Sequence, residues 1–364
     1  MALPQPRPGV LDLPLYVGGK SKIAGVSRVI KLSSNEAALG PSPKAVAAYE
    51  AARADLAAYP VGPSTGLREA VADIHGLDPE RIICGCGSDE ILNLLCRAYA
   101  GPGDEVVYTR HGFLIYGIYA ASVGAKPVQA EEKNLTADVD TLLAAVTPNT
   151  KLVFIANPNN PTGTYMPKAE LERLRGGLRE DILLVIDGAY AEFMTAPDYD
   201  SGLEMAKTLP NVVATRTFSK IYGLASLRIG WGTGAKAIID ALERLRAPFN
   251  TSGPAQAAAI AAVRDQAHVE KARRHNTKWM GVAIQRLRGL GLKVVGEHAN
   301  FVSPEFPATG PKNVIAADEF LQSRGIIARR VEAYGLPNHL RISIGDDEAT
   351  ALALDAVEAF MKQP

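Results

Sequence analysis

One lysine is placed among residues that could use it for chemistry. Lys220 follows an apolar run at 212–214, lies among small and hydroxyl residues, and is followed eight positions later by Arg228. A lysine amine that is partly withdrawn from water can act as a nucleophile toward an aldehyde. An arginine offers a fixed fork of donors to a phosphate or carboxylate. Because most lysines are solvated surface groups, Lys220 gains significance only if other reactive groups lie close to it.

Two apolar runs that precede Lys220 in the chain each lead to side chains that could react or bind a ligand beside it. Residues 183–186 form a short apolar run that ends at Asp187, with Tyr190 just beyond it, and residues 152–156 lead into a proline-punctuated loop that holds Asn160. Runs of this kind are typical of buried parallel strands, and open α/β sheets bind ligands at the carboxyl ends of their strands. We therefore expect Asn160, Asp187, Tyr190 and Lys220 at one edge of one sheet.

These groups together meet the requirements of pyridoxal phosphate. A carboxylate can keep the pyridine nitrogen protonated, so that the ring accepts electrons, while an amide and a phenol hydrogen-bond the ring hydroxyl. A lysine can bond covalently to the aldehyde carbon. The sequence therefore indicates a pyridoxal phosphate site.

The same motifs carry a family resemblance. The Asn-Pro-Asn-Asn-Pro-Thr-Gly loop at 157–163, the Asp187–Tyr190 pair and the Ser219-Lys220 segment together resemble the fold type I aminotransferases. The resemblance extends from 31–36 to 340–345 and is most similar to the histidinol-phosphate aminotransferases. It implies an α/β fold with a large α/β/α domain, built on a mostly parallel sheet, and a smaller α/β domain.

A phosphate site is indicated at residues 85–90. An apolar strand, a glycine turn and the start of a helix bring free backbone N–H groups and the helix dipole together, which favours an anion at Gly87, Ser88 and Asp89. An ordinary Ser/Asp helix cap is the alternative. The Gly85-x-Gly87 pair lacks the third glycine of a dinucleotide fingerprint.

The predicted site residues fall into three groups. The catalytic residues are Lys220, Asp187 and Tyr190. The cofactor-binding residues are Tyr59, Gly87, Ser88, Asp89, Phe113, Asn160, Asp187, Tyr190, Thr217, Ser219, Lys220 and Arg228. The substrate-binding residues are Tyr16, Asn35, Arg329 and Arg341. No metal site is expected.

Several of these roles follow from the resemblance alone. It implies that Phe113 stacks on the pyridine ring and that Tyr59 crosses a homodimer interface to the partner's cofactor phosphate. It also implies that Arg341 grips an α-carboxylate, that Arg329 binds a substrate phosphate and that Tyr16 faces the substrate. The ordinary alternatives are packed aromatic side chains for the first two and for Tyr16, and surface ion pairs for the arginines.

Composition limits the possible partners. The 39 basic and 39 acidic residues cancel, and the absence of a basic run argues against a nucleic-acid partner. The apolar stretches are too short for a membrane span, and the first residues lack the apolar core of a secretory signal. The spacing of Cys84, Cys86 and Cys96 suggests neither a disulfide scaffold nor a metal site, which favours a reducing, cytoplasmic location.

The predicted organisation has three parts. Residues 1–44 form an N-terminal arm that, by the resemblance, packs with the small domain; residues 45–255 form the large cofactor-binding domain; and residues 256–364 form the small domain with a linking helix. Within this frame we expect helices over 43–58 and 135–148, one long helical run from about 255 to 287, and a strand at 292–295.

The resemblance implies a specific activity. The leading reaction converts histidinol phosphate and 2-oxoglutarate to imidazole-acetol phosphate and glutamate, a step of histidine biosynthesis. The alternatives are an aromatic or broad-range aminotransferase and, less favoured, a phosphoamino-acid decarboxylase on the same scaffold. A cofactor-sensing regulatory domain is disfavoured because no basic helix precedes the core.

Overall fold

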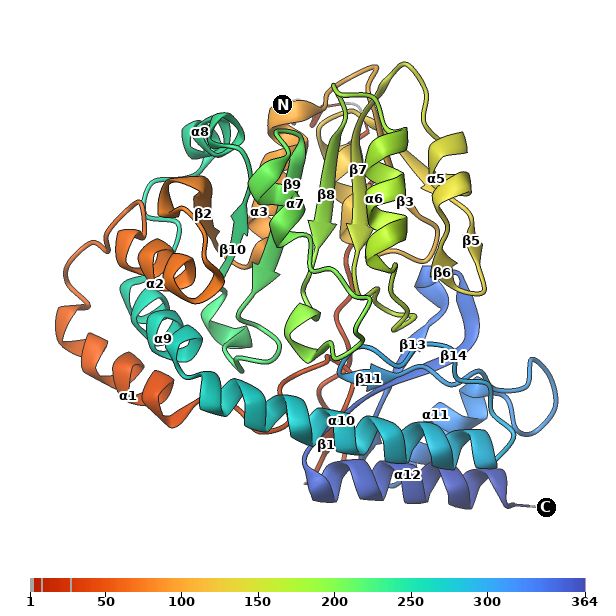
Figure 1. Cartoon of the computed structure of the whole chain (residues 1–364). Helices are drawn as coiled ribbons and strands as arrows, with labels where there is room; N and C mark the ends of the chain where they lie inside the picture. The colour runs from red at the N-terminus through yellow and green to blue at the C-terminus, as the bar shows by residue number, and fades with distance from the viewer. Residues whose placement is uncertain (1–2, 8, 27, 364) are drawn as a thin grey trace.

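A seven-stranded sheet lies at the centre of the molecule (Figure 1). The computed structural model describes residues 3–7, 9–26 and 28–363. In spatial order the strands are β2 (Ile82–Gly85), β10 (Gly230–Thr233), β9 (Val212–Thr217), β8 (Leu183–Asp187), β7 (Thr150–Ala156), β3 (Glu105–Thr109) and β4 (Lys126–Ala130). All neighbouring pairs are parallel except those of β10, which runs antiparallel to β2 and β9.

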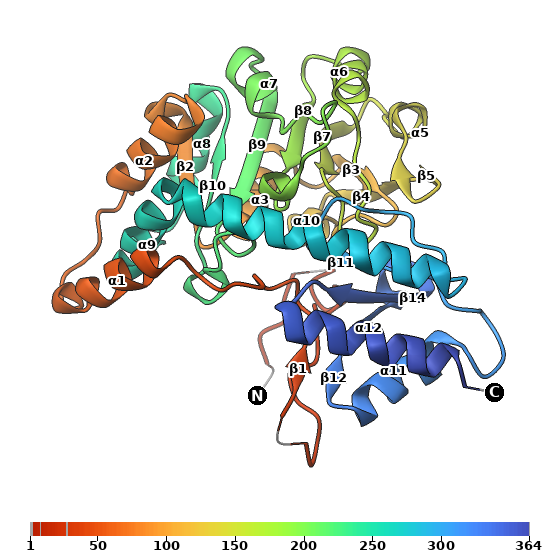
Figure 2. The same cartoon turned by 60° about the horizontal axis from the view of Figure 1, so that its bottom comes forward.

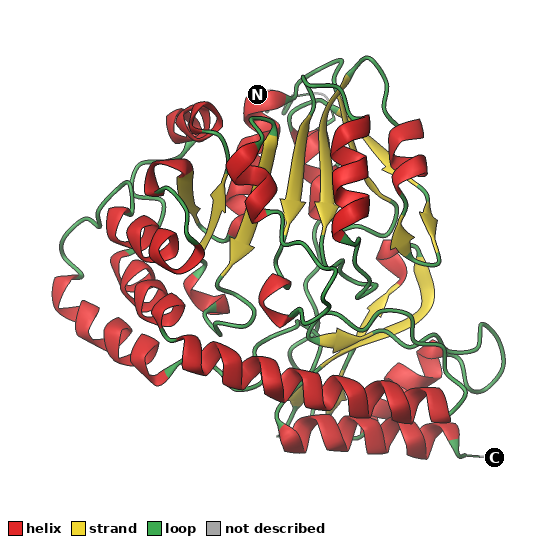
Figure 3. Ribbon diagram, viewed as in Figure 1, coloured by secondary structure: helices red, strands yellow, loops and turns green. Residues whose placement is uncertain are grey.

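Helices cover both faces of this sheet, as Figure 3 shows. One face carries α3 (Ser88–Tyr99), α4 (Ile115–Ser122) and α8 (Lys236–Leu245), and the other carries α5 (Val139–Ala144), α6 (Lys168–Gly177) and α7 (Leu203–Thr208). Strand β7 shows why: Leu152 and Phe154 pack on the first face, while Val153 and Ile155 pack on the second. An apolar run buried on both sides therefore produces the expected α/β/α layers.

The C-terminal region builds a second, smaller layer. Strands β11 (Phe301–Val302), β14 (Leu336–Ser343) and β13 (Arg329–Val331) form an antiparallel sheet, and β1 (Ile30–Lys31) pairs with β12 (Ile326–Ile327) in parallel. Helices α10 (Gln266–Gly289), α11 (Val314–Ser323) and α12 (Asp347–Met361) share its core. Figure 2 shows α10 and α12 side by side beneath the large sheet.

A helical layer lies at the other end of α10. It consists of α1 (Pro43–Ala51), α2 (Thr65–His75) and α9 (Gly253–Arg264), and α9 packs against both α1 and α2. One apolar core runs from α2 and α9 to Ala272 of α10, whereas the core of the C-terminal layer begins at Met280. The 255/256 domain boundary stays a prediction. The change from one apolar core to the other falls within α10, between Ala272 and Met280. Residues 1–2, 8 and 27 of the predicted arm and residue 364 of the predicted small domain lie outside the described residues.

Four element predictions were wrong in detail. Helix α1 ends at Ala51 and tightens into a 3₁₀ turn over Ala52–Asp55. The long helical run is divided at Asp265, whose carboxylate accepts hydrogen bonds from Ser42 and Lys44. Residues 132–137 form a hairpin of β5 (Glu132–Lys133) and β6 (Thr136–Ala137), so that only α5 remains of the helix predicted over 135–148. Residues 292–295 form no strand, since Lys293 makes just an isolated bridge to Glu305.

Among the described residues, no helix combines the length and apolar character needed to cross a membrane.

Candidate active site

Three adjacent parallel strands deliver the reactive side chains to one edge of the large sheet. Asp187 is the last residue of β8, and Lys220 and Asn160 follow the carboxyl ends of β9 and β7. They line one cavity of about 250 Å³. The predicted site residues that line it are Tyr16, Asn35, Ser88, Asp89, Phe113, Asn160, Asp187, Tyr190, Thr217, Ser219, Lys220, Arg228, Arg329 and Arg341.

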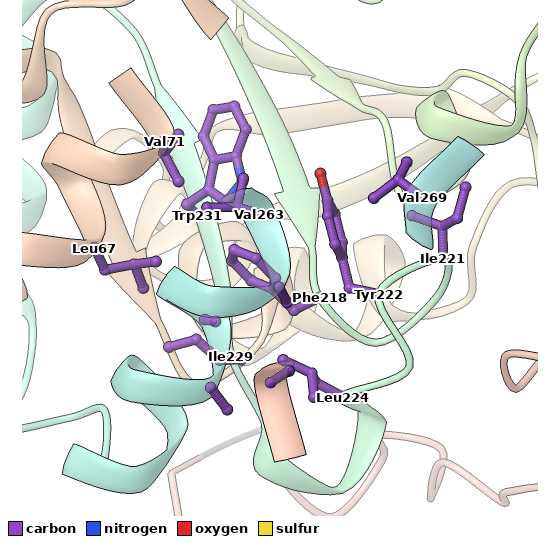
Figure 4. Packing of buried hydrophobic residues seen from close by; sticks show 14 of the residues in the cluster. Leu67, Val71, Phe218, Ile221, Tyr222, Leu224, Ile229, Trp231, Val263 and Val269 are labelled. Carbon is purple, nitrogen blue, oxygen red and sulfur yellow. The ribbon is translucent and has the colours of Figure 1, made fainter. Parts of the chain in front are cut away.

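The loop that carries Lys220 is fixed by its neighbours. Phe218, Ile221 and Tyr222 are almost completely buried, and Figure 4 shows them packed among residues of α2, β10, α9 and α10. The Lys220 ammonium lies 5.6 Å from the centroid of the Tyr190 ring. Apolar residues on both sides therefore hold the backbone rigid while the lysine side chain faces the cavity.

Asp187 is a buried carboxylate with two hydroxyl donors. The Tyr116 hydroxyl donates to Oδ2 at 2.8 Å, and the Thr215 hydroxyl donates to Oδ1 at 3.1 Å. Burial raises the pKa of Asp187, and these two hydrogen bonds oppose that rise because they stabilise the charged form. An Asp187 carboxylate that is buried yet hydrogen-bonded is well suited to face a protonated ring nitrogen.

The cavity also presents donors for a phosphate. Gly87, at a φ of +77°, precedes the first turn of α3, where Ser88 and Asp89 have backbone N–H groups without helical partners. Arg228 donates to the Ser219 hydroxyl at 3.1 Å and to the Asp89 carboxylate at 3.0 Å. A Cβ at Gly87 would lie 2.6 Å from the Arg228 guanidinium, and the positive φ at this position also favours glycine.

Asp89 contributes a carboxylate as well as a backbone donor here. Burial raises the pKa of Asp89, and the adjacent positive charge of Arg228 opposes the rise. A carboxylate would repel phosphate, so the backbone N–H is the group of Asp89 that suits an anion.

Two arginines also line the cavity. Arg329 of β13 lies directly opposite Arg341 of β14 in the sheet register. Arg341 donates to the Asn160 side-chain oxygen at 2.5 Å and to the Ser33 carbonyl at 2.8 Å, and Arg329 donates to the Val17 carbonyl. Burial lowers the pKa of Arg341. Among the described residues no carboxylate lies within 4.0 Å of the Arg341 guanidinium, so its charge is available to an anionic ligand.

Aromatic residues border the cavity. Phe113 makes edge-to-face contacts with Tyr116 at 5.9 Å and with Tyr16 at 6.2 Å between ring centroids. The arm residue Tyr16 thereby lies beside Phe113 in the lining of the cavity. Stacking of Phe113 on a pyridine ring stays a prediction.

Tyr59 lies outside this cavity. Its side chain is 83% exposed and stacks on Phe249 with 4.6 Å between the ring centroids. Its predicted contact with the cofactor of a partner subunit stays a prediction.

Several residues at the site were missed by the sequence analysis. Tyr116 and Thr215 hold the Asp187 carboxylate, and Ser343 holds the Asn35 side chain. Tyr116 lies in the first turn of α4, three positions beyond Phe113, but no pattern in the sequence pairs it with Asp187. Alternation along β9 places Thr215 and Thr217 on the same face, which was a usable signal.

The donor set fits pyridoxal phosphate. A buried carboxylate, an arginine beside a helix N-terminus and a lysine amine all line the same cavity. The buried Arg341 Nε has no hydrogen-bond partner among the described residues. Within the part of the chain that the structure describes, no group of His, Cys, Asp and Glu side chains could hold a metal ion.

Comparisons with known proteins agree with this arrangement. The model of the family "Aminotransferase class I and II" matches residues 27–357. A curated histidinol-phosphate aminotransferase of Rhodopseudomonas palustris (strain TIE-1) is 53% identical over 365 residues, with 100% of both chains covered. One from Rhodospirillum rubrum is 54% identical over 359 residues, covering 99% of this chain and 97% of its own.

Solved structures show the same similarity. The crystal structure of histidinol-phosphate aminotransferase from Sinorhizobium meliloti in complex with pyridoxal-5'-phosphate superposes with a TM-score of 0.89, at 29% identity over 99% of this chain and 98% of that one. Aspartate aminotransferase from Thermus thermophilus with maleate gives a TM-score of 0.81 at 25% identity, covering 91% of each chain.

Proposed function

The chain belongs to the class I and II aminotransferase family, and we propose that it transfers the amino group of histidinol phosphate to 2-oxoglutarate in histidine biosynthesis. Its cofactor is pyridoxal phosphate. The observation that carries the proposal is the convergence of a lysine amine, a buried carboxylate and an arginine-lined helix N-terminus on one cavity. The products would be imidazole-acetol phosphate and glutamate.

The residues that line the cavity take different parts in binding the cofactor and moving the proton. Pyridoxal phosphate, when bound, supplies an aldehyde that bonds to amines and a ring that withdraws electrons. Asp187 would accept a hydrogen bond from the ring nitrogen, and Arg228 with the first turn of α3 would bind the phosphate. The Lys220 Nζ takes the proton from the substrate carbon that carries the amino group. Asn160 and Tyr190 orient the ring through its hydroxyl.

Arg329 and Arg341 would recognise the anionic groups of both substrates. Like charges placed directly opposite each other in a sheet are unfavourable, and an anion bound beside them removes this cost. Histidinol phosphate brings a phosphate and 2-oxoglutarate brings two carboxylates, so each partner in the reaction can neutralise the pair. We assign the substrate phosphate to Arg329, with Tyr16 nearby, and the carboxylate to Arg341.

A homodimer is part of the proposal. Large apolar side chains are exposed around Tyr59, and a second copy of this chain would cover them. This patch comprises Leu56, Tyr59, Val61 and Phe249. The expected outcome of light scattering is a dimer, with Tyr59 reaching the partner's cofactor phosphate. A monomer that retains full activity would contradict this part.

A cytoplasmic location is proposed as well. Cys84, Cys86 and Cys96 are all free thiols, which suits a reducing compartment.

The visible spectrum of the purified protein tests the function. With bound pyridoxal phosphate the protein should show an absorbance band that histidinol phosphate removes at far lower concentration than phenylalanine does. An equal response to phenylalanine would indicate an aromatic or broad-range aminotransferase, and release of carbon dioxide would indicate a decarboxylase. If added pyridoxal phosphate produces no band, the cofactor assignment fails.

A further inference from the structure

Three buried residues from distant parts of the chain form a hydrogen-bonded series that ends at the cavity. Ser343 at the end of β14 contacts Asn35, and the Asn35 Nδ2 group lies 2.9 Å from the Tyr190 hydroxyl. Asn35 is 1% exposed and Ser343 is 3% exposed, so water does not compete for these bonds. Asn35 has a φ of +55°, a left-handed conformation that is uncommon for residues other than glycine.

The hydrogen bonds of the series all run in one direction, beginning at one backbone group. The Asn35 N–H can only donate, and it donates to the Ser343 Oγ at 2.8 Å. The Ser343 hydroxyl hydrogen is then free to point to the Asn35 Oδ1, 3.0 Å away. Because Oδ1 faces Ser343, the Asn35 Nδ2 faces Tyr190 and donates to its hydroxyl oxygen. With the amide in this orientation, each of these donors reaches an acceptor.

This arrangement decides where the hydroxyl hydrogen of Tyr190 can point. Its oxygen already accepts from Asn35, and among the described residues the Tyr190 hydroxyl donates no hydrogen bond. We infer that Ser343 and Asn35 are positioning residues that keep the Tyr190 hydroxyl hydrogen directed into the cavity, where it can be donated to the ring hydroxyl oxygen of pyridoxal phosphate. This inference rests on the proposed function. It gives Asn35 a role beside Tyr190 rather than a direct contact with the substrate.

A pH titration of the visible absorbance of the cofactor-loaded protein tests the inference. A hydrogen bond donated to the ring oxygen stabilises its negative charge, so losing the donor should move the spectral midpoint to higher pH. Tyr190→Phe should raise the midpoint by about one pH unit, the size expected for one hydrogen bond to a charged oxygen. Ser343→Ala should raise it by about half as much, because the tyrosine hydroxyl is then free to turn away.

Two variants serve as controls. Ser343→Thr keeps the hydroxyl and should restore the midpoint of the unmodified protein. Ser303→Ala removes a buried hydroxyl that follows the neighbouring strand β11 and has no hydrogen-bond partner among the described residues. It should leave the midpoint unchanged and so matches Ser343→Ala for any general effect on packing.

The double variant gives the decisive result. In a Tyr190→Phe background, Ser343→Ala should produce no further shift, since it acts only through the tyrosine hydroxyl. An equal shift in both backgrounds, or no shift from Ser343→Ala alone, would overturn the inference. If Ser343→Ala does not fold, Asn35→Gly replaces it, because glycine tolerates the φ of +55° and lacks the amide donor. Absence of any visible band from the unmodified protein would instead count against the proposed function.

Discussion

Tyr116→Phe should weaken cofactor binding through Asp187. The variant removes the hydroxyl that donates to the Asp187 carboxylate at 2.8 Å. The aromatic ring, which stacks on Phe154 with 4.9 Å between centroids and 3° between planes, is retained. The change therefore isolates one hydrogen bond from the packing around it.

The magnitude follows from the burial of Asp187. A hydrogen bond to a charged group contributes about 1.5–3 kcal/mol, and each 1.4 kcal/mol corresponds to about a tenfold change in affinity. Since Thr215 still donates to the other carboxylate oxygen, we expect the low end of this range. The dissociation constant for pyridoxal phosphate should rise about tenfold in Tyr116→Phe.

The sign of the pH dependence can also be stated. Burial raises the pKa of Asp187, and the Tyr116 hydrogen bond opposes this rise, so removing that bond raises the pKa further. A carboxyl group is charged above its pKa and loses its charge as the pH falls through it. The acid side of the activity profile should consequently move to higher pH in Tyr116→Phe.

Titration of the apoprotein with pyridoxal phosphate, followed by fluorescence quenching, measures the affinity. Tyr108→Phe is the matched control, because Tyr108 is a buried tyrosine with 6.2 Å between its ring centroid and that of Tyr116. If Tyr116→Phe binds the cofactor as tightly as the unmodified protein, or if Tyr108→Phe weakens binding equally, the assignment of Asp187 to the ring nitrogen is refuted.

Two further substitutions test other residues of the site, and a third tests the packing against the loop at 157–163. Lys220→Ala should lower turnover at least about a hundredfold while thermal unfolding is unchanged, and near-normal rates would contradict its role. Arg341→Lys should raise the KM for 2-oxoglutarate about tenfold, because a lysine cannot offer paired donors, and an unchanged KM would contradict carboxylate binding. Gly296→Ala would place a Cβ 1.9 Å from the Thr162 carbonyl oxygen. It should destabilise the protein by about 1–3 kcal/mol in urea unfolding, whereas Gly281→Ala, with nothing within 4 Å, should not.

The sequence was most informative about the large sheet. Residues 152–156 and 183–186 are buried on both faces, and such runs are recognisable because no polar residue interrupts them. The end of each run then places Asn160 and Asp187 by topology alone, since carboxyl ends of parallel strands share one edge. The convergence of these groups was therefore predictable before any coordinates.

The contacts between distant segments could not be predicted in this way. Tyr116 approaches Asp187 across 71 positions, and Ser343 approaches Asn35 across 308. Their partners depend on how α4 and β14 pack, which single-residue patterns do not encode. The break at Asp265 has the same origin: helix propensity favours a continuous run, but hydrogen bonds from Ser42 and Lys44 stabilise a non-helical aspartate.

The arrangement around Arg341 explains why the site combines two layers of the molecule. Its guanidinium belongs to the small C-terminal sheet, yet it donates to Asn160 on a loop of the large sheet. The Asn160 and Ser33 oxygens satisfy hydrogen bonds of Arg341 without neutralising its charge. A buried cation held only by neutral acceptors keeps a large part of its desolvation cost, and an anionic substrate removes that cost when it binds. The same contact ties the arginine proposed to bind substrate to the loop proposed to orient the cofactor ring. Binding an anion at Arg341 therefore acts on both layers of the active site at once.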